Sequence, residues 1–174
     1  MSQTQCLDFV EVGATEFRDA LAHALTPVTI VATHGDHGIA GVTCSAVCSV
    51  CDTPPTIMVC VNRKSYSNSL IKANGVLCVN WLAADHAPVS QVFAGAGQVP
   101  MEQRFECDAW TTLATGAPHY REAIVALDCR VLEAMEIGTH SVFLARVVAT
   151  ARSAGGTALG YVRRSYATAT PALA

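Results

Sequence analysis

The sequence has few charged residues. Asp, Glu, Lys and Arg together make up 14% of its 174 residues, whereas 51% of the residues are apolar. A small soluble monomer usually carries more charge than this on its surface. The composition therefore predicts a homo-oligomer that hides apolar area at an interface between copies.

Long apolar runs are also missing. The chain has no stretch of about 18 uninterrupted apolar residues, the length that a transmembrane helix needs. The segment from Met1 to Phe9 lacks a basic region followed by an apolar stretch, so no signal peptide is visible. We therefore expect a cytoplasmic protein that does not bind a membrane.

Basic residues are too few for a protein that binds the backbone of nucleic acid. Lys and Arg number 11 against 14 Asp and Glu, which gives a net charge of −3, and apart from Arg163-Arg164 the basic residues are scattered. Nucleic-acid binding usually requires a basic patch or stripe. The charge balance argues against this class of function.

The signatures of several enzyme classes are absent as well. The sequence contains no G-x-S-x-G nucleophile elbow, no H-E-x-x-H zinc motif and no Walker P-loop. It also lacks the G-x-G-x-x-G fingerprint of Rossmann domains, so any nucleotide must be held in another way. Without such machinery, chemistry would have to come from a bound cofactor.

Cysteine, in contrast, is abundant, with eight residues. In the absence of an export signal we expect free buried thiols rather than disulfides. Cys44, Cys48 and Cys51 have the spacing C-x3-C-x2-C, without a fourth ligand in the usual pattern. Because His34 and His37 are close in sequence, a zinc or iron–sulfur site stays open as an alternative.

Residues 41–55 are rich in small and hydroxyl-bearing side chains and lie between two predicted strands, 29–33 and 56–61. The hydroxyl groups at the centre of this segment belong to Thr43, Ser45 and Ser49. Small side chains allow a ligand to approach the backbone, and Pro54 and Pro55 end the segment because proline has no N–H donor. We predict a ligand cradle; a packed turn of small residues is the alternative.

Two further features are candidates for ligand contacts. The predicted turn 62–68 is polar and contains the donors Asn62, Lys64, Ser65 and Ser67, which together are able to hold a phosphate. His140 follows Gly138 at the start of a predicted strand, where it could face a pocket. Taken singly, each feature is more often structural, as a solvated turn or a hydrogen-bonded histidine.

Hydrophobic periodicity predicts a mainly β protein. The expected strands are 28–33, 39–43, 57–61, 76–81, 123–134, 141–151 and, as the last one, 158–162. The expected helices are 69–73, 85–93 and one capped by Thr15 that ends before Pro27. Hairpin turns are expected at 34–38 and 153–156, irregular structure at 95–120, and Asp128 on an exposed strand face. Many short strands with peripheral helices indicate a small β-barrel in a single domain.

Several motifs then occur in a characteristic order: Phe17-Arg-Asp-Ala20, Thr43-Cys-Ser-Ala-Val-Cys-Ser-Val50, Asp52-Thr-Pro-Pro55, Leu77-Cys-Val-Asn80, Phe93-Ala-Gly95, Gly138-Thr-His140 and Tyr161-Val-Arg-Arg164. Together they resemble the short-chain flavin reductase family, the NAD(P)H-dependent reductase components of two-component flavin monooxygenases such as 4-hydroxyphenylacetate 3-monooxygenase. The resemblance runs from about residue 16 to residue 166.

The resemblance implies an FMN-binding split β-barrel with peripheral helices, formed by one flavin reductase-like domain over residues 1–174. It also implies a homodimer, in agreement with the low charge content. The residues that it places along the flavin are Thr43, Cys44, Ser45, Ala46, Cys48 and Ser49. Those along the ribityl phosphate are Asn62, Lys64, Ser65 and Ser67. His140 would act beside the nicotinamide or the flavin edge as the candidate catalytic residue. Further implied cofactor contacts are Asn80, Phe93, Arg164 and Tyr166.

The implied activity is that of an NAD(P)H:flavin oxidoreductase. NADH, or NADPH, would pass hydride to FMN or FAD, and a partner monooxygenase would take up the free reduced flavin in a transient encounter. Two alternatives stay open: a flavoprotein that passes electrons to another acceptor such as a corrinoid, and a flavin-binding protein without turnover. Ser165 and Ala167 depart from the basic run of relatives, which argues against carrying over a dinucleotide contact there; relatives also often have Asn at the position of Thr29.

Overall fold

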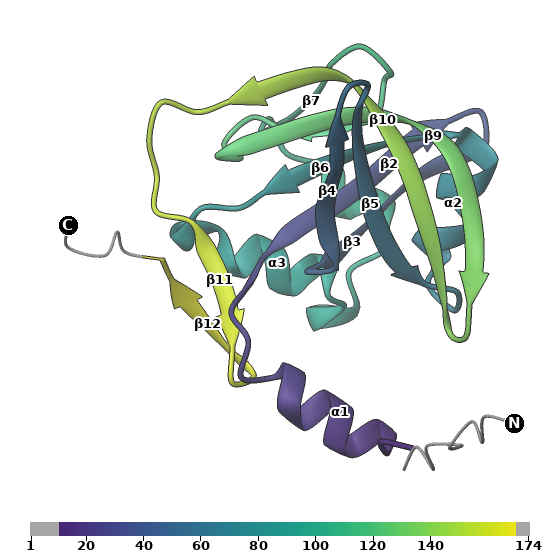
Figure 1. Cartoon of the computed structure of the whole chain (residues 1–174). Coiled ribbons are helices and arrows are strands. Elements are labelled where there is room, and N and C mark those ends of the chain that lie inside the picture. Colours follow the sequence, from purple (N-terminus) through teal and green to yellow (C-terminus); the bar gives the residue numbers. More distant parts are fainter. Residues whose placement is uncertain (1–10, 170–174) are drawn as a thin grey trace, which may run out of the picture.

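Antiparallel strands dominate residues 11–169, the part of the chain that this computed structural model describes (Figure 1). The strands are β1 (Thr26–Pro27), β2 (Thr29–Gly35), β3 (Gly38–Cys44), β4 (Val47–Asp52), β5 (Pro55–Asn62), β6 (Val76–Trp81), β7 (Trp110–Thr112), β8 (Pro118–Tyr120), β9 (Val125–Ile137), β10 (His140–Arg152), β11 (Leu159–Val162) and β12 (Ser165–Thr168). The helices are α1 (Ala14–Leu21), α2 (Tyr66–Asn74) and α3 (Ala87–Phe93), with 3-10 turns η1 (Ala84–His86), η2 (Ala96–Gln98) and η3 (Glu102–Phe105).

The main sheet has seven strands in the order β3-β2-β6-β9-β10-β5-β4, and all its neighbours pair antiparallel. The sheet curls around, but its two edge strands, β3 and β4, are not paired with each other. They are consecutive in the chain and are joined through Ser45 and Ala46. The expected split β-barrel with peripheral helices is therefore confirmed, with its open seam at the segment that the sequence singled out.

The core lies on both sides of β2 and β6. In β2, Val31 points into the cluster inside the barrel around Phe143, while Ile30 and Ala32 point into a second cluster under α3. All four side chains are fully buried. A strand covered on both faces reads as a continuous apolar run rather than an alternating one, which is the pattern of residues 28–33.

Several turns follow the sequence prediction. The β2–β3 hairpin turns at Gly38, which has φ of 109°, and α2 ends at Gly75 with φ of 68°. Both positions are in the left-handed region that glycine adopts without steric cost. Helix α2 begins at Tyr66, three residues earlier than expected, and α1 has Gly13 rather than Thr15 at its N-cap, so that capping prediction is wrong.

Three other expectations need correction. Residues 47–52 belong to strand β4, so the loop expected at 43–49 shrinks to Ser45 and Ala46. Asp128 is completely buried and not exposed, because the Thr115 backbone N–H and hydroxyl donate to its carboxylate and satisfy it inside the protein. The segment after β10 is no hairpin, because β11 pairs with β1 and with β12, an additional strand.

Two general properties can be stated for the described residues. None of their helices is long and apolar enough to cross a membrane. Their seven cysteines are all free, as expected, but Cys48, Cys51 and Cys107 are exposed, so the prediction of burial holds for part of the set.

Candidate active site

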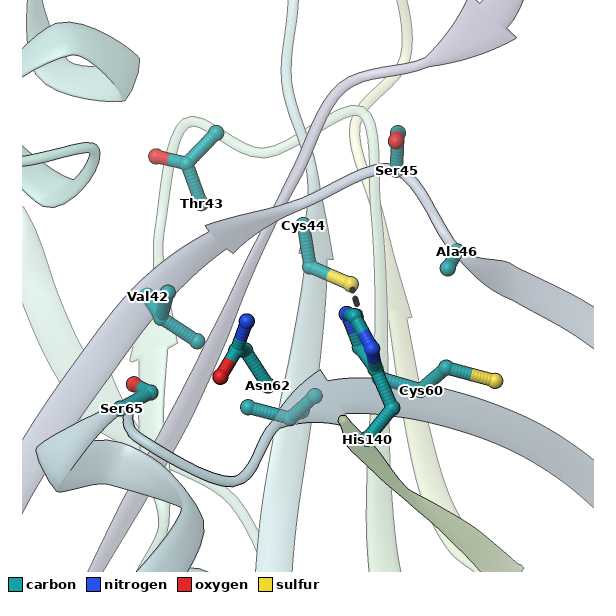
Figure 2. A pocket seen from close by; sticks show the side chains of 10 residues that line it. Val42, Thr43, Cys44, Ser45, Ala46, Cys60, Asn62, Ser65 and His140 are labelled. Carbon is teal, nitrogen blue, oxygen red and sulfur yellow. Dashed lines mark hydrogen bonds between the residues drawn. The ribbon is translucent and has the colours of Figure 1, made fainter. Parts of the chain in front are cut away.

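A cavity of about 230 Å³ opens at the seam of the barrel, where the end of β3, the end of β5 and the start of β10 meet (Figure 2). Its lining residues are Val42, Thr43, Cys44, Ser45, Ala46, Cys60, Val61, Asn62, Ser65 and His140. Six of these were expected from the resemblance to lie along a flavin, and His140 was expected beside its edge. The structure thus brings the cradle, the polar turn and the histidine together.

The pairing of the strands explains this convergence. His140 lies directly opposite Asn62 in the β10–β5 pair. Cys60 and Asn62 are two residues apart on β5, so their side chains leave the strand on the same face. The Cys60 N–H donates to the Ala46 carbonyl oxygen at 2.9 Å, which continues the β4–β5 pairing up to the Ser45-Ala46 connection. The cavity therefore lies where the chain crosses from one edge of the sheet to the other.

The side chains enter the cavity from opposite walls. In Figure 2 the Cys44 thiol, which donates to the Cys60 carbonyl oxygen at 3.4 Å, lies on one side of the cavity and the imidazole of His140 on the other, and the Asn62 amide lies between His140 and Val42. The Lys64 N–H donates to Asn62 Oδ1 at 2.9 Å, which assigns the amide nitrogen to the side facing the cavity. A ligand carbonyl or phosphate oxygen could accept a hydrogen bond from that nitrogen.

Helix α2 adds a positive end to the site. Ser65 is its N-cap residue, lines the cavity and donates its own N–H to the Asn62 carbonyl at 3.0 Å. The first N–H groups of a helix are unsatisfied within the helix and attract anions such as phosphate. The first turn also holds the Ser67 hydroxyl, which is buried and has no hydrogen-bond partner among the described residues.

The two thiols of the cavity are neutral. Burial raises the pKa of Cys44 to about 11, against a smaller lowering by a hydrogen bond with the Ala46 backbone. Burial also raises the pKa of Cys60. Both groups therefore remain protonated near neutral pH and act as small, weakly polar wall atoms rather than as nucleophiles.

A second cavity of about 240 Å³ adjoins the first on the other side of the β3 end. It shares Thr43, Cys44 and Ser45 with the first cavity and is completed by Val28, Ala94, Tyr161 and Tyr166. The Tyr166 hydroxyl bonds the Ser90 hydroxyl at 2.9 Å, and Thr43 donates to the Ser90 carbonyl at 2.6 Å. Strand β12 is thereby tied through α3 to the cradle.

The residues present fit a flavin nucleotide. The walls are made of small side chains, hydroxyls and an amide, the α2 N-terminus supplies a site for phosphate, and the seam lets a planar ring reach the backbone at Ser45. Ligand sites usually measure about 300–1,000 Å³, and neither cavity alone reaches this size. A flavin nucleotide would therefore extend from the first cavity into the spaces beside it.

Other predicted site residues lie elsewhere. Asn80 and Phe93 are buried in the core, where the Asn80 amide bonds the backbone of Ile30, Pro118 and Tyr120 and offers no surface to a ligand. The remaining residues have these positions: Cys48 and Ser49 are exposed on β4, Lys64 lines a neighbouring groove, Ser67 is buried in α2, and Arg164 forms an ion pair with Asp19.

Sequence reasoning missed Val42, Cys60 and Val61 as cavity residues. They were read as parts of buried apolar strands, and in such runs nothing marks the residues at which a strand reaches an opening. For Cys60 a signal existed, because it lies two residues before Asn62 and shares its face of β5. Within the described residues no group of three His, Cys, Asp or Glu side chains is placed to hold a metal ion.

Comparisons with known proteins point to one family. The family model for the flavin reductase like domain matches residues 21–170. The FMN reductase (NADH) RutF of Ancylobacter novellus is 46% identical over 155 residues, which cover 89% of this chain and 84% of that protein. The protein of the same name from Bradyrhizobium diazoefficiens is 46% identical over 158 residues, covering 91% and 87%.

Solved structures show the same fold. The bacterial protein BorF, the flavin reductase component of a two-component tryptophan halogenase, has a TM-score of 0.83 at 28% identity and covers 90% of this chain and 98% of its own. A homologue of nitrilotriacetate monooxygenase component B from Mycobacterium thermoresistibile has a TM-score of 0.80 at 25% identity, covering 91% and 90%. With the family model spanning nearly the whole barrel and the seam, this chain belongs to the flavin reductase-like domain family.

Proposed function

We propose that the protein is an NADH-dependent flavin reductase that uses FMN as a substrate and releases it in reduced form. Membership of the flavin reductase-like family and two relatives named FMN reductase (NADH) at 46% identity support this activity. The observation that carries it is the cavity at the barrel seam, which joins a hydroxyl-lined cradle to the N-terminus of α2.

In this proposal a bound flavin supplies the ring that accepts hydride from the nicotinamide, and the protein supplies orientation and charge stabilisation. The Asn62 amide nitrogen, the Ser45 N–H and the N–H groups in the first turn of α2 would hold polar edges of the ligand. Fixed donors of this kind stabilise negative charge without having to reorganise, and holding two reactants in register lowers the barrier by several kcal/mol.

His140 is the one titratable side chain of the cavity other than the two neutral thiols. Its Nδ1 lies 2.9 Å from the Thr139 hydroxyl. When that hydroxyl donates to Nδ1, the proton of the neutral imidazole is on Nε2, which is then available as a donor to the ligand. We assign His140 the role of holding a proton at this atom beside the reacting groups.

The exposure of the cradle to solvent supports a flavin that binds, is reduced and dissociates again. Ser45 and Ala46 are both exposed, so the seam has a direct exit to solvent. We propose that a flavin-dependent monooxygenase takes up the released product. A role as the reductase of a two-component system is supported by the similar protein BorF, which is named the flavin reductase component of a two-component tryptophan halogenase. A bound flavin that reduces another acceptor is the second candidate, since the same cavity would serve it.

We also propose that the protein is a homodimer. Large apolar side chains are exposed on β4, β9 and β10, namely Val50, Leu132, Met135, Ile137 and Val148. Single exposed apolar residues are normal, but these strands lie in the consecutive part β9-β10-β5-β4 of the sheet, and exposed apolar residues concentrated there support an interaction surface. Light scattering coupled to gel filtration should give twice the 18.3 kDa mass of one chain; the mass of a single chain would exclude the dimer.

The decisive experiment follows NADH oxidation at the nicotinamide absorbance with gel-filtered protein. A rate that rises with added FMN and then saturates would establish flavin as a substrate. A rate that ignores added flavin but depends on another acceptor would favour the bound flavoprotein. The absence of oxidation with NADH and with NADPH, with FMN and with FAD, would refute the proposal.

A pair of histidine variants connects the activity to the cavity. His140→Asn should lower kcat about 10²-fold or more if the histidine supplies a proton donor, while FMN binding changes less. His37→Asn is the matched control, because His37 is exposed in the β2–β3 turn. Equal rates for both variants would remove His140 from the chemistry.

A further inference from the structure

A second, larger groove begins where the cavity ends. It has a volume of about 920 Å³ and lies between the N-terminal half of α1 and two turns of the barrel, 62–64 and 138–140. Asn62 and His140 line both the groove and the cavity. Figure 1 shows α1 extending below the barrel, beside the loops at that end. A ligand in the cavity thus has a continuous path into the groove.

The groove presents positive charge. Its cationic side chains are Arg18, Arg63 and Lys64. Arg63 is paired with Glu136, with Nε and Oε2 2.5 Å apart. Arg18 contacts the Thr15 hydroxyl at 3.4 Å, and within residues 11–169 neither Arg18 nor Lys64 forms an ion pair. Two cations at the mouth of the cavity are therefore left for an anionic ligand.

The groove also presents an aromatic ring. Phe17 lines it and is 57% exposed, although a Phe side chain normally contributes to stability by being buried. The groove thus combines one exposed aromatic face with two cations and a polar turn. Such a combination suits a ligand that has a flat apolar ring at one end and a phosphate at the other.

We propose that this groove binds the adenosine phosphate half of a dinucleotide, with the adenine against Phe17 and the phosphate between Arg18 and Lys64. The proposal rests on the proposed reductase function, because the cavity would hold the other half of the same molecule. The volume of the groove falls within the range of about 300–1,000 Å³ typical of ligand sites, whereas the cavity is smaller.

Two molecules carry this chemical group, FAD and NADH, and the experiment distinguishes them. FAD differs from FMN, and NADH from reduced nicotinamide mononucleotide, by the adenosine phosphate half alone. A groove that binds this half of FAD makes the KM for FAD, but not for FMN, depend on α1. A groove that binds this half of NADH makes the KM for NADH, but not for the mononucleotide, depend on α1.

The test uses the full chain with Phe17 and Arg18 both replaced, F17A/R18Q. The matched control is L21A, on the same helix, because Leu21 is 54% exposed and does not line the groove. Binding of AMP to the flavin-free protein is measured by titration calorimetry, and KM is measured for each full ligand and its truncated partner. Loss of a charge-assisted hydrogen bond and a ring contact should weaken AMP and one dinucleotide about 10- to 100-fold.

The expected result is weaker AMP binding and a raised KM for FAD or for NADH, with FMN, the mononucleotide and the L21A control unchanged. Equal changes for full and truncated ligands would overturn the proposal, as would wild-type protein that does not bind AMP at millimolar concentration. Because AMP binding requires no turnover, failure of the groove is distinguishable from failure of the reductase function, which would appear as no NADH oxidation with any flavin.

Discussion

One wall of the groove is formed by the paired turns at 62–64 and 138–140, and the other is helix α1. The turns are joined to each other and to the barrel. The Arg63 N–H donates to the Thr139 carbonyl at 2.9 Å, and Asn68 of α2 donates to the Val61 carbonyl at 3.0 Å and to the Ser141 hydroxyl at 2.9 Å. That hydroxyl donates in turn to Glu136 at 2.9 Å.

The opposite wall has little of this support. Helix α1 has no buried residue. Its C-terminal end is attached to the β11–β12 turn, where the Arg163 N–H donates to the Ala22 carbonyl and Arg164 pairs with Asp19. Both arginines of that turn have positive φ, 51° and 61°, which costs about 1–2 kcal/mol for each non-glycine residue.

The comparison shows how one site can combine two needs. Turns fixed by several buried hydrogen bonds hold a reacting ring in one orientation, as catalysis requires. A helix held at one end, with few buried contacts, belongs to the low-stability part of a structure and can open locally. A diffusible ligand needs such a wall in order to enter and leave. Each test below changes either the barrel side or the α1 side of the site and leaves the other side intact.

The largest effect should come from Asn68→Ala. Asn68 is 2% exposed, and its replacement removes two buried hydrogen bonds, to the Val61 carbonyl and to the Ser141 hydroxyl, which keeps only Glu136 as a partner. Each lost hydrogen bond costs about 0.5–1.5 kcal/mol, and the missing side chain leaves a void. We therefore expect the free energy of unfolding to fall by about 3 kcal/mol and the KM for FMN to rise. Ser69→Ala, an exposed position on the same helix, is the control. Similar urea midpoints for both variants would contradict the comparison.

The next test makes the same substitution on each side. A Cβ added to Gly41 would meet Phe93 at 2.6 Å and Phe105 at 3.0 Å, within an aromatic cluster behind the cradle. A Cβ added to Gly160 would meet the end of Leu25, also at 2.6 Å. Leu25 is 56% exposed and can rotate away, whereas the packed rings cannot.

We therefore expect Gly41→Ala to destabilise the protein by about 1–3 kcal/mol through overpacking and Gly160→Ala by less than about 0.5 kcal/mol. The change in Tm of each variant, measured by thermal melting, shows how tightly each side is packed. If Gly160→Ala lowers Tm as much as Gly41→Ala, the region around α1 is as tightly packed as the barrel, and the proposed contrast fails.

The sequence predicted the features that depend on local patterns in the chain. Apolar runs such as 76–81 became strands at the expected places, because burial on both faces leaves one solution for such a run. The cradle was found because small residues and hydroxyls at 43–46 are an unusual local composition. These signals are local in the chain.

What was missed depends on long-range contacts. Asp128 looked like an exposed residue of an alternating strand, and only Thr115, on a loop of no regular pattern, accounts for its burial. The pairing of β11 with β1 is likewise set by residues far apart in the chain. Arg164 appeared beside the cofactor by resemblance, but its partner in the structure is Asp19 of α1.

A smaller effect concerns pH and the fixed wall. The hydrogen bond from Lys72 lowers the pKa of Glu136 below its ordinary value of 4.5, and the hydrogen bond from Ser141 and the positive charge of Arg63 lower it further. A carboxyl with a lowered pKa in the folded state contributes stability above its unfolded pKa and loses it as pH falls through the folded value. We expect this contribution to be complete above about pH 5 and to disappear as the pH falls below about 4.5.

Glu136→Gln should remove that part of the pH dependence, so the variant and the wild type should differ in stability at pH 7 and converge at low pH. Urea unfolding at a series of pH values measures it. Glu133→Gln is the control, because Glu133 is exposed on the same strand, β9. A constant difference between Glu136→Gln and the wild type at every pH would show that ionisation of Glu136 is not its cause.

The smallest effect on stability should come from Asp19→Asn on the helix wall. The Asp19–Arg164 pair is largely exposed, at 55% and 67%, and pairs of this kind contribute about 0–1 kcal/mol. Tm should therefore stay nearly constant, while hydrogen exchange in α1 accelerates because its C-terminal attachment is weakened. If α1 binds the adenosine phosphate group, AMP binding should weaken about two- to threefold, less than in F17A/R18Q, since the helix samples its bound position less often.

Glu16→Gln, on the same helix and without an ion pair among the described residues, is the control. A large fall in Tm for Asp19→Asn would mean that α1 stabilises the barrel itself, and the two walls would then not differ in the way proposed.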